Sequence, residues 1–427
     1  MRNAQYSRRV ANFHSAGFKQ FANAQEQLAL LNRTWSQTRQ RVPYWRSTSE
    51  ELDLPVRFSS LEEFIDLVPV SDKVLLSSRP EEFRDPHRGP DWYRNSSGTT
   101  GTPTPMAAWR SENRFTELGI WAARAQLGIQ PGSQLFLIWG HLHGMGQGWQ
   151  PRWNRVSRAI RDELIGYRRH SAYDLDPARV ASVWVALQRS AADYSIMLPT
   201  FLEQSVRVLH PAQLSLRETR VQVVILTGES LSRPRAEYER LLGVPVRMEY
   251  GTSETGVIAQ EVTNDRYIVN TGLHLLEGVR DAGGDVLATV TSLYPRATPL
   301  IRYQIGDRIE LLDGDHGSSV YEFRKVLGRV RPVLRLETGD FVHTAAVNHA
   351  MEKVGTVSRF QIVQREGVVD RISIVGSWNQ ADEASAVAAV RSVLTQAHPH
   401  LASVPLVTDG VFGRTRTGKT PVVFLED

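Results

Sequence analysis

A short segment near residue 100 concentrates glycines and hydroxyl side chains, a combination that can bind phosphate. Glycines let the backbone approach a phosphate closely, and exposed amides and threonine hydroxyls donate hydrogen bonds to its oxygens. The GxxxxGK[ST] spacing of a Walker loop is absent. On residue types alone, a polar surface turn is the commoner explanation. The segment consists of Ser96, Ser97, Gly98, Thr99, Thr100 and Gly101, followed by Thr102 and Pro103.

Five further strings place glycine beside a carboxylate, a hydroxyl or a cation. They are TGES at 227–230, YGTSE at 250–254, YQIGD at 303–307, GR at 328–329 and RTGK at 416–419. Together with the first segment, they resemble in type and order the motifs of the adenylate-forming (ANL) superfamily of acyl-CoA synthetases, adenylation domains and luciferases. The phenylacetate-CoA ligase branch is the most similar part of that superfamily. The resemblance covers about residues 92 to 420.

The resemblance implies a site for ATP and Mg²⁺ built from these strings. Tyr250 offers a flat face for adenine, and the backbone of Gly228 and Glu229 borders the other face. Glu254 is suited to holding Mg²⁺ against the triphosphate, because Mg²⁺ prefers hard oxygen ligands and shares them with phosphate. The alternative for Glu254 is a solvated loop acid. The phosphate segment and the neighbours of Tyr250 complete the expected nucleotide site: Ser96 to Gly101, Gly251, Thr252 and Ser253.

Two charged positions follow from the same resemblance. Asp307 accepts both ribose hydroxyls as a bidentate carboxylate, with Arg329 as a nearby donor. Lys419 corresponds to the catalytic lysine that bridges the oxygen of the acid and the α-phosphate, which stabilises the transition state electrostatically. A solvated surface lysine is the alternative. Only five of the 50 basic residues are lysines, so the presence of a lysine at position 419 favours a functional role for it.

A segment rich in histidine, glycine and tryptophan occupies the region that the resemblance assigns to the acid pocket. It reads WGHLHGMGQGWQPRWNR over residues 139–155. His141 and His143 can donate to a small anion or act as a base, since histidine titrates near neutrality; His141 is the catalytic candidate, and Gly144 lies beside them. The alternative, given equal weight, is that either histidine has only a structural role. No third ligand for a metal bound by this pair is evident.

Three functions remain open for this site. In the first, ATP adenylates a small carboxylate, which passes to CoA, a carrier-protein thiol or an amine. In the second, the acid is nitrite and the acceptor an aromatic amine, as in the diazotases of natural-product pathways that resemble this superfamily. In the third, the chain is a nucleotide-binding relative without catalysis. Retention of Glu254, Asp307 and Lys419 together argues against the third.

The sequence departs from the family pattern at two places, the phosphate loop and the hinge before the small domain. Thr102 and Thr104 stand where the phosphate loop usually carries lysine, so the phosphates need other cations. Arg331 stands where the family commonly has an acidic hinge residue, and Pro332 restricts it further. This departure disfavours the rotation of a small domain, and with it CoA as the acceptor.

The elements that position these motifs indicate an α/β fold with two domains. A large layered domain over 1–327 is followed by a small, mobile α+β domain over 328–427 that carries the catalytic lysine. The first 90 residues read as helices, and Ser111 and Gly128 bound a further helix. Residues 133–140 read as a buried strand. Residues 177–209 show a helical pattern, and strands with turns follow from about 265 to 312.

Composition sets the remaining expectations. The 427 residues are 41% hydrophobic and 22% charged, with a net charge of +4, which is ordinary for a globular protein. Without cysteine, the chain forms no disulfide and no thioester of its own. Dispersed arginines argue against nucleic acid as a partner, and the lack of a long apolar run or a signal peptide predicts a cytoplasmic protein without a membrane span. The sequence leaves a homodimer open.

Overall fold

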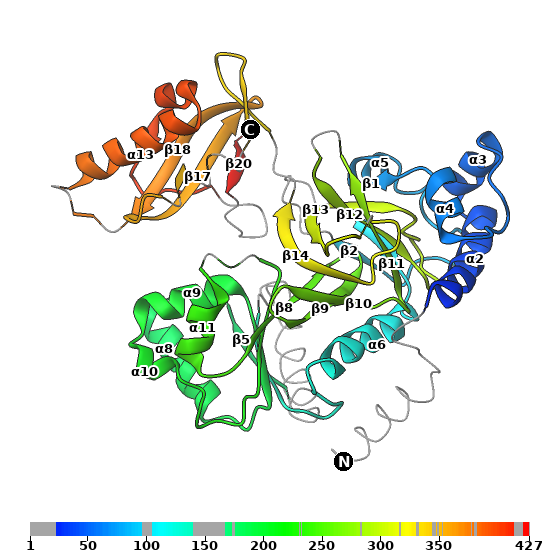
Figure 1. The fold of residues 1–427 in the computed structure, drawn as a ribbon, viewed down its shortest axis with the longest axis horizontal. Coiled ribbons are helices and arrows are strands. Elements are labelled where there is room, and N and C mark those ends of the chain that lie inside the picture. Colours follow the sequence, from blue (N-terminus) through cyan, green and yellow to red (C-terminus); the bar gives the residue numbers. More distant parts are fainter. Residues whose placement is uncertain are drawn as a thin grey trace, which may run out of the picture. The chain divides into compact units, whose positions relative to one another are not determined.

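The structure of the protein is a computed structural model. It describes residues 23–95, 105–139, 167–172, 176–229, 231, 233–281, 284–315, 317–329, 333–343, 347, 350, 351, 353–376, 378, 379, 382–413 and 422–426. The chain divides into two compact units (Figure 1). The larger comprises Met1–Arg94 and Pro105–Gly328, and the smaller comprises Asn95–Thr104 and Arg329–Asp427. None of the described helices has the length and apolar composition that crossing a membrane requires.

Four helices begin the larger unit: α2 (Ala24–Arg41), α3 (Pro43–Glu51), α4 (Leu61–Leu67) and α5 (Lys73–Ser78). Asn23 starts α2 through a capping box, in which its side chain accepts from the amide of Glu26 and the Glu26 carboxylate accepts from the amide of Asn23. Trp35, Trp45 and Phe64 are fully buried in one apolar cluster with residues of the sheet. The predicted helices of this region are confirmed.

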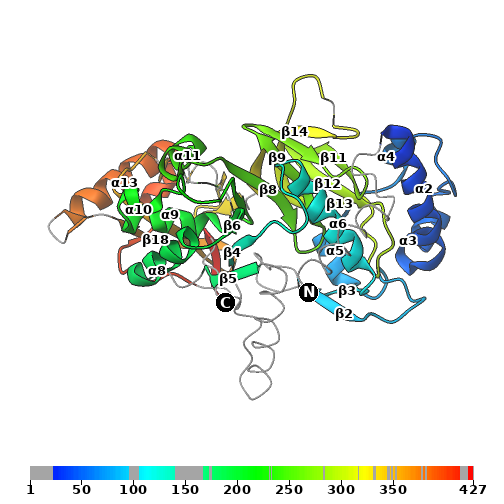
Figure 2. The ribbon, with the colours of Figure 1, turned by 90° about the horizontal axis from the view of Figure 1, so that it is seen from below.

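Parallel strands form one half of the main sheet, in the order β8, β7, β6, β4, β5. Helices α8 to α11 lie together on one face (Figures 1 and 2), while Trp121 of α6 packs on the other. The bounds are β4 (Leu135–Trp139), β5 (Tyr167–Ser171), β6 (Tyr194–Met197), β7 (Val224–Thr227), β8 (Val246–Thr252), α6 (Glu112–Ala125), α8 (Pro177–Gln188), α9 (Pro199–Val208), α10 (Pro211–Leu214) and α11 (Arg235–Leu242).

Both faces of these strands are buried. Phe136 and Ile138 of β4 face the cluster under α8 to α11, whereas Leu135 belongs to the cluster that contains Trp121. A strand covered on both sides reads as a continuous apolar run. For that reason the helical pattern expected over 177–209 was wrong in its middle, where β6 separates α8 from α9. The strand expected at 133–140 is confirmed as β4.

Antiparallel strands form the other half of the main sheet, in the order β11, β12, β13, β14, β10, β9, with β9 joined to β8. A short parallel strand, β1, pairs with β13, and β2 pairs with β3 as a separate hairpin. The bounds are β1 (Ser71–Asp72), β2 (Trp92–Asn95), β3 (Pro105–Ala108), β9 (Gly256–Thr263), β10 (Arg266–Val269), β11 (His274–Arg280), β12 (Val286–Ser292), β13 (Tyr303–Leu311) and β14 (Glu322–Arg329).

The helix after the phosphate segment begins where the sequence predicts, but by another interaction. Ser111 precedes α6 in an αR conformation and its side chain makes no capping hydrogen bond. The carboxylate of Glu112 instead accepts from the amide of Trp109 at 2.8 Å. Gly128 adopts φ 74° just beyond the helix, as a helix-terminating glycine does.

The smaller unit is a mixed sheet in the order β16, β15, β18, β17, β20, with β19 beside β18. Ala386, Val390 and Leu394 lie at helical spacing on the buried side of α13, and Val390 and Leu394 pack on the sheet. The bounds are β15 (Val333–Arg335), β16 (Phe341–His343), β17 (Val357–Arg365), β18 (Val368–Gly376), α13 (Glu383–Ala397), the 3₁₀ helix η2 (Pro399–Ser403), β19 (Leu406–Val407) and β20 (Val423–Glu426). The expected α/β fold class is confirmed.

One buried arginine ties the N-terminal helices to the start of β13. Arg302 adopts φ 42°, which is uncommon for a residue other than glycine. Its guanidinium forms an ion pair with Glu277 at 2.8 Å and donates to the carbonyl oxygens of Ile65 and Val68, both at 2.5 Å. These contacts keep the residue in a strained conformation.

We predict that Glu277→Gln lowers the free energy of unfolding of the larger unit by about 3–5 kcal/mol, because it leaves the buried Arg302 without its counter-charge. Urea unfolding followed by tryptophan fluorescence measures this loss. Glu322→Gln is the matched control, since its partner Arg266 is exposed and surface pairs contribute little. Equal stability of the two variants would contradict the prediction.

Candidate active site

The carboxyl ends of the parallel strands meet at one edge of the sheet, where open α/β sheets usually bind ligands. Gly228 follows β7 at this edge with φ 84°, a conformation that favours glycine. A Cβ there would lie 3.5 Å from the ring of Trp139, which ends β4. The TGES string and the end of β4 are therefore neighbours at this edge.

The side chain of Glu229 is bound to a neighbouring helix. Its carboxylate accepts from the amide of Thr200 at 2.9 Å and from the hydroxyl of the same residue. Thr200 lies in the first turn of α9, where unpaired amides favour a negative charge. The side chain fixes the turn, and both Gly228 and Glu229 are exposed residues.

A tight turn between β8 and β9 carries the YGTSE string. A Cβ on Gly251 would lie 2.3 Å from the carbonyl oxygen of Gly256, and Gly256 itself has φ 75°. Only glycine fits the first position, because the two backbones approach too closely for a side chain. Thr252 and Thr255 share a hydrogen bond between their hydroxyls at 3.1 Å, which holds the turn together.

Tyr250 and Asp307 come together although they are far apart in sequence. The phenol of Tyr250 donates to Oδ2 of Asp307 at 3.1 Å, and both residues are buried. The Tyr250 ring belongs to an apolar cluster and stands edge-on to Phe323. Gly306, with φ 84°, precedes Asp307 in β13. The structure thus joins the YGTSE and YQIGD strings through one hydrogen bond.

Glu254 is a buried carboxylate, 7% exposed, at the end of the same turn. Its Oε2 accepts from the hydroxyl of Ser253 at 3.0 Å. Within the described part of the chain, no basic side chain forms an ion pair with it. A buried carboxylate without a guanidinium fits a divalent cation, which prefers hard oxygen ligands. Among described residues, no cluster of three or more His, Cys, Asp or Glu could hold a metal.

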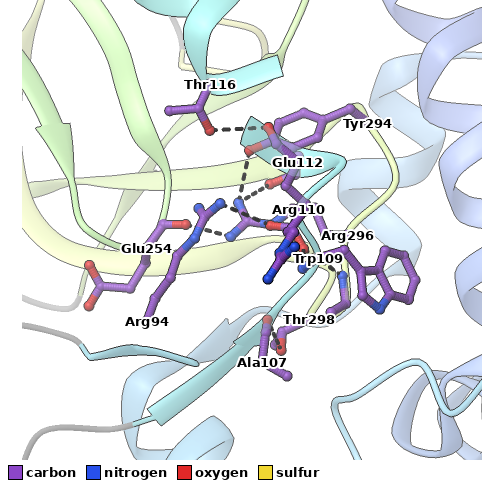
Figure 3. A network of polar contacts seen from close by, with 12 residues as sticks. Arg94, Ala107, Trp109, Arg110, Glu112, Thr116, Glu254, Tyr294, Arg296 and Thr298 are labelled. Atoms are coloured by element: carbon purple, nitrogen blue, oxygen red, sulfur yellow. Dashed lines mark hydrogen bonds and ion pairs between the residues drawn. The ribbon is translucent and has the colours of Figure 1, made fainter. Parts of the chain in front are cut away.

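A polar network that the sequence analysis missed adjoins Glu254 (Figure 3). Glu112 is fully buried, and Oε2 forms ion pairs with Arg94 at 3.2 Å and with Arg296 at 3.8 Å. Oε1 accepts from the amides of Trp109 and Ala297. Arg296 also donates to the carbonyl oxygen of Glu254 at 2.5 Å. The three charged residues are distant in sequence, so no local motif indicated them.

Several predicted residues lie outside the described part of the chain. They are Ser96, Ser97, Gly98, Thr99, Thr100, Gly101, His141, His143, Gly144 and Lys419. Arg329 ends β14, and its backbone alone is described. Their assigned roles therefore stay predictions from sequence.

Solved structures of similar fold identify the architecture. A 2-hydroxyisobutyryl-CoA ligase in complex with an acyl-AMP superposes with a TM-score of 0.65 at 18% identity, covering 94% of this chain and 89% of that one. The chain has the adenylate-forming fold. Fatty acyl-adenylate ligases from E. coli and L. pneumophila share it with a TM-score of 0.53 at 14% identity, over 77% of this chain and 68% of the other.

Comparison of sequences adds little to this assignment of the fold. No family model matches the chain. Protein CapK of Staphylococcus aureus is 26% identical over 144 residues, which are 33% of this chain and 32% of that protein. The match thus spans about a third of the curated relative. The resemblance read from the motifs is confirmed at the level of the fold.

We predict that Tyr250→Phe raises the dissociation constant for ATP about threefold to tenfold, because Asp307 loses the hydrogen bond that orients it. Isothermal titration calorimetry measures the constant. Tyr321→Phe is the control, since the Tyr321 hydroxyl is buried without a hydrogen-bond partner among the described residues. Unchanged affinity in Tyr250→Phe would remove the phenol from the nucleotide site.

Proposed function

We propose that the protein uses ATP to convert a small acid into its AMP ester, releasing pyrophosphate, and then transfers the activated acid to an external nucleophile. An oxygen of the acid attacks the α-phosphorus, and the bond from that phosphorus to the β-phosphate oxygen breaks. The observation that carries the proposal is the hydrogen bond of Tyr250 to Asp307 beside a turn whose Glu254 carboxylate forms no ion pair with the described residues.

The nucleotide roles follow from these positions. Asp307 accepts the ribose hydroxyls with Arg329 as a donor, and Tyr250 with the backbone of Gly228 and Glu229 borders adenine. Glu254 holds Mg²⁺, which when bound neutralises phosphate charge. The 96–101 segment binds the phosphates, with Thr252 and Ser253 supplying further hydroxyls.

The acid site and the catalytic cation rest on the sequence motifs. His141, His143 and Gly144 bind the small anion, and His141 exchanges a proton with it. Lys419 offsets the charge that develops as two anions approach each other. A solved structure of the 2-hydroxyisobutyryl-CoA ligase, which has a similar fold, is a complex with 2-HIB-AMP and CoA, and this supports an acyl-adenylate as the intermediate here.

We expect ATP–pyrophosphate exchange with at least one small carboxylate in a panel of aryl, short aliphatic and hydroxy acids, with nitrite as a separate arm. Lys419→Ala should lower this exchange about 100-fold or more while leaving the dissociation constant for ATP within about twofold, since the lysine acts on the transition state. Exchange with nitrite alone would replace the carboxylate by diazotase chemistry. Absence of exchange with every acid would overturn the proposal.

The acceptor is expected to be a small amine rather than CoA. Proline fixes its own φ and biases Arg331 toward extended values, which handicaps a hinge rotation before thioester formation. The acyl-AMP formed by the enzyme is offered CoA, a carrier-protein thiol, or aryl and alkyl amines, and AMP release and product mass are followed. Efficient thioester formation with CoA would refute the hinge argument and restore an ordinary phenylacetate-CoA ligase-like reaction.

A further inference from the structure

Arg94 and Arg296 share a single buried carboxylate. The Arg94 side chain is 10% exposed and that of Arg296 is 2% exposed, while Glu112 is fully buried. The hydroxyls of Ser292 and Tyr294 accept from Arg296, at 3.2 and 3.3 Å. Nε of each arginine is buried without a hydrogen-bond partner in the described residues. Two positive charges therefore face one negative charge in a poorly solvated position.

Three other carboxylates of the larger unit are balanced differently. Each of Glu249, Glu261 and Glu277 forms an ion pair with one arginine among the described residues. The guanidinium of Arg302, for example, is saturated by Glu277 and two carbonyl oxygens. The group formed by Arg94, Glu112 and Arg296 differs from these pairs, because it has two arginines for one carboxylate.

The surplus charge affects neighbouring groups. Burial and the adjacent Arg296 lower the pKa of Arg94, although Glu112 and Tyr294 act in the opposite direction. Burial, with Arg296 as the second cause, also lowers the pKa of His274 to about 3. Arg94 nevertheless stays charged, because the pKa of a guanidinium is far above neutrality. A buried cation without full compensation is costly until an anion pairs with it.

Glu254 lies next to this surplus charge. Arg296 donates to its carbonyl oxygen, and Figure 3 shows the guanidiniums of Arg94 and Arg296 side by side, with Glu254 adjacent. All four charged residues belong to the larger unit. A divalent cation bound to Glu254 would add further positive charge beside Arg94 and Arg296. An anion that neutralises these charges must therefore carry several negative charges.

We propose that Arg94 and Arg296 form a cationic pair that binds the β- and γ-phosphates of ATP, with Glu112 holding both guanidiniums in place. The inference rests on the proposed function and adds residues that no motif assigns. A triphosphate carries several negative charges, whereas a small acid carries one. The planar guanidinium fork also matches the oxygens of phosphate. The phosphate loop lacks its usual lysine, and the two arginines supply the positive charge that the phosphates need.

The test compares ligands that do and do not contain the β- and γ-phosphates. Calorimetry measures the binding of MgATP, magnesium pyrophosphate and AMP to the full-length wild type and to Arg94→Gln and Arg94→Lys. Arg94→Lys keeps the charge beside Glu112, so it provides a second variant that tests the inference if Arg94→Gln unfolds. Arg235→Gln is the matched control, because it removes a partly buried arginine from a balanced pair with Glu261.

Arg94→Gln should weaken MgATP and pyrophosphate binding about 10- to 100-fold and AMP binding no more than about twofold. Arg94→Lys should lie between that variant and the wild type, and Arg235→Gln should bind all three ligands as the wild type does. Equal losses for AMP and MgATP, unchanged MgATP binding, or a change confined to the KM of the acid would each overturn the inference. A wild type that binds no nucleotide would instead refute the proposed function itself.

Discussion

The larger unit depends on pairing buried carboxylates with arginine. Burial raises the pKa of Glu261 and Glu277 even beside their arginine partners, so the cost of removing these acids from water is large. Arginine suits such positions because its planar, weakly hydrated group donates several hydrogen bonds at fixed angles. The requirement agrees with a composition in which five of the 50 basic residues are lysines.

These pairs also determine where the candidate site residues lie. The ion pair of Arg302 and Glu277 fixes the start of β13, the strand that carries Asp307. Arg124 of α6 pairs with Glu249, which directly precedes Tyr250 in β8. The two residues joined by the Tyr250 hydrogen bond are thus each anchored by a buried charge pair. Loss of such a pair is expected to affect the site as well as stability, because each pair anchors a strand that carries a site residue.

The sequence predicted the elements whose patterns are local and missed those that tertiary burial decides. The strand β4 and the strings at Tyr250 and Asp307 were recognisable because apolar runs and glycine turns have short-range causes. The strand β6 was not, since burial on both faces removes the alternation that separates strand from helix. The contact of Glu112 with Arg94 and Arg296 has no sequence periodicity, because its members come from β2, α6 and the segment after β12.

The same constraint separates structural acids from a candidate ligand-binding acid. Glu112, Glu261 and Glu277 are buried, the Glu249 side chain is only 10% exposed, and each has an arginine partner that compensates its charge. Glu254 is buried to a similar degree, yet among described residues its carboxylate accepts only from Ser253, while Arg296 binds its backbone. Within the described residues, the Glu254 carboxylate thus lacks a basic partner while Arg94 and Arg296 share one carboxylate nearby, an arrangement that a cation and a polyphosphate together would neutralise. Local charge balance therefore favours a metal–nucleotide ligand over either component alone.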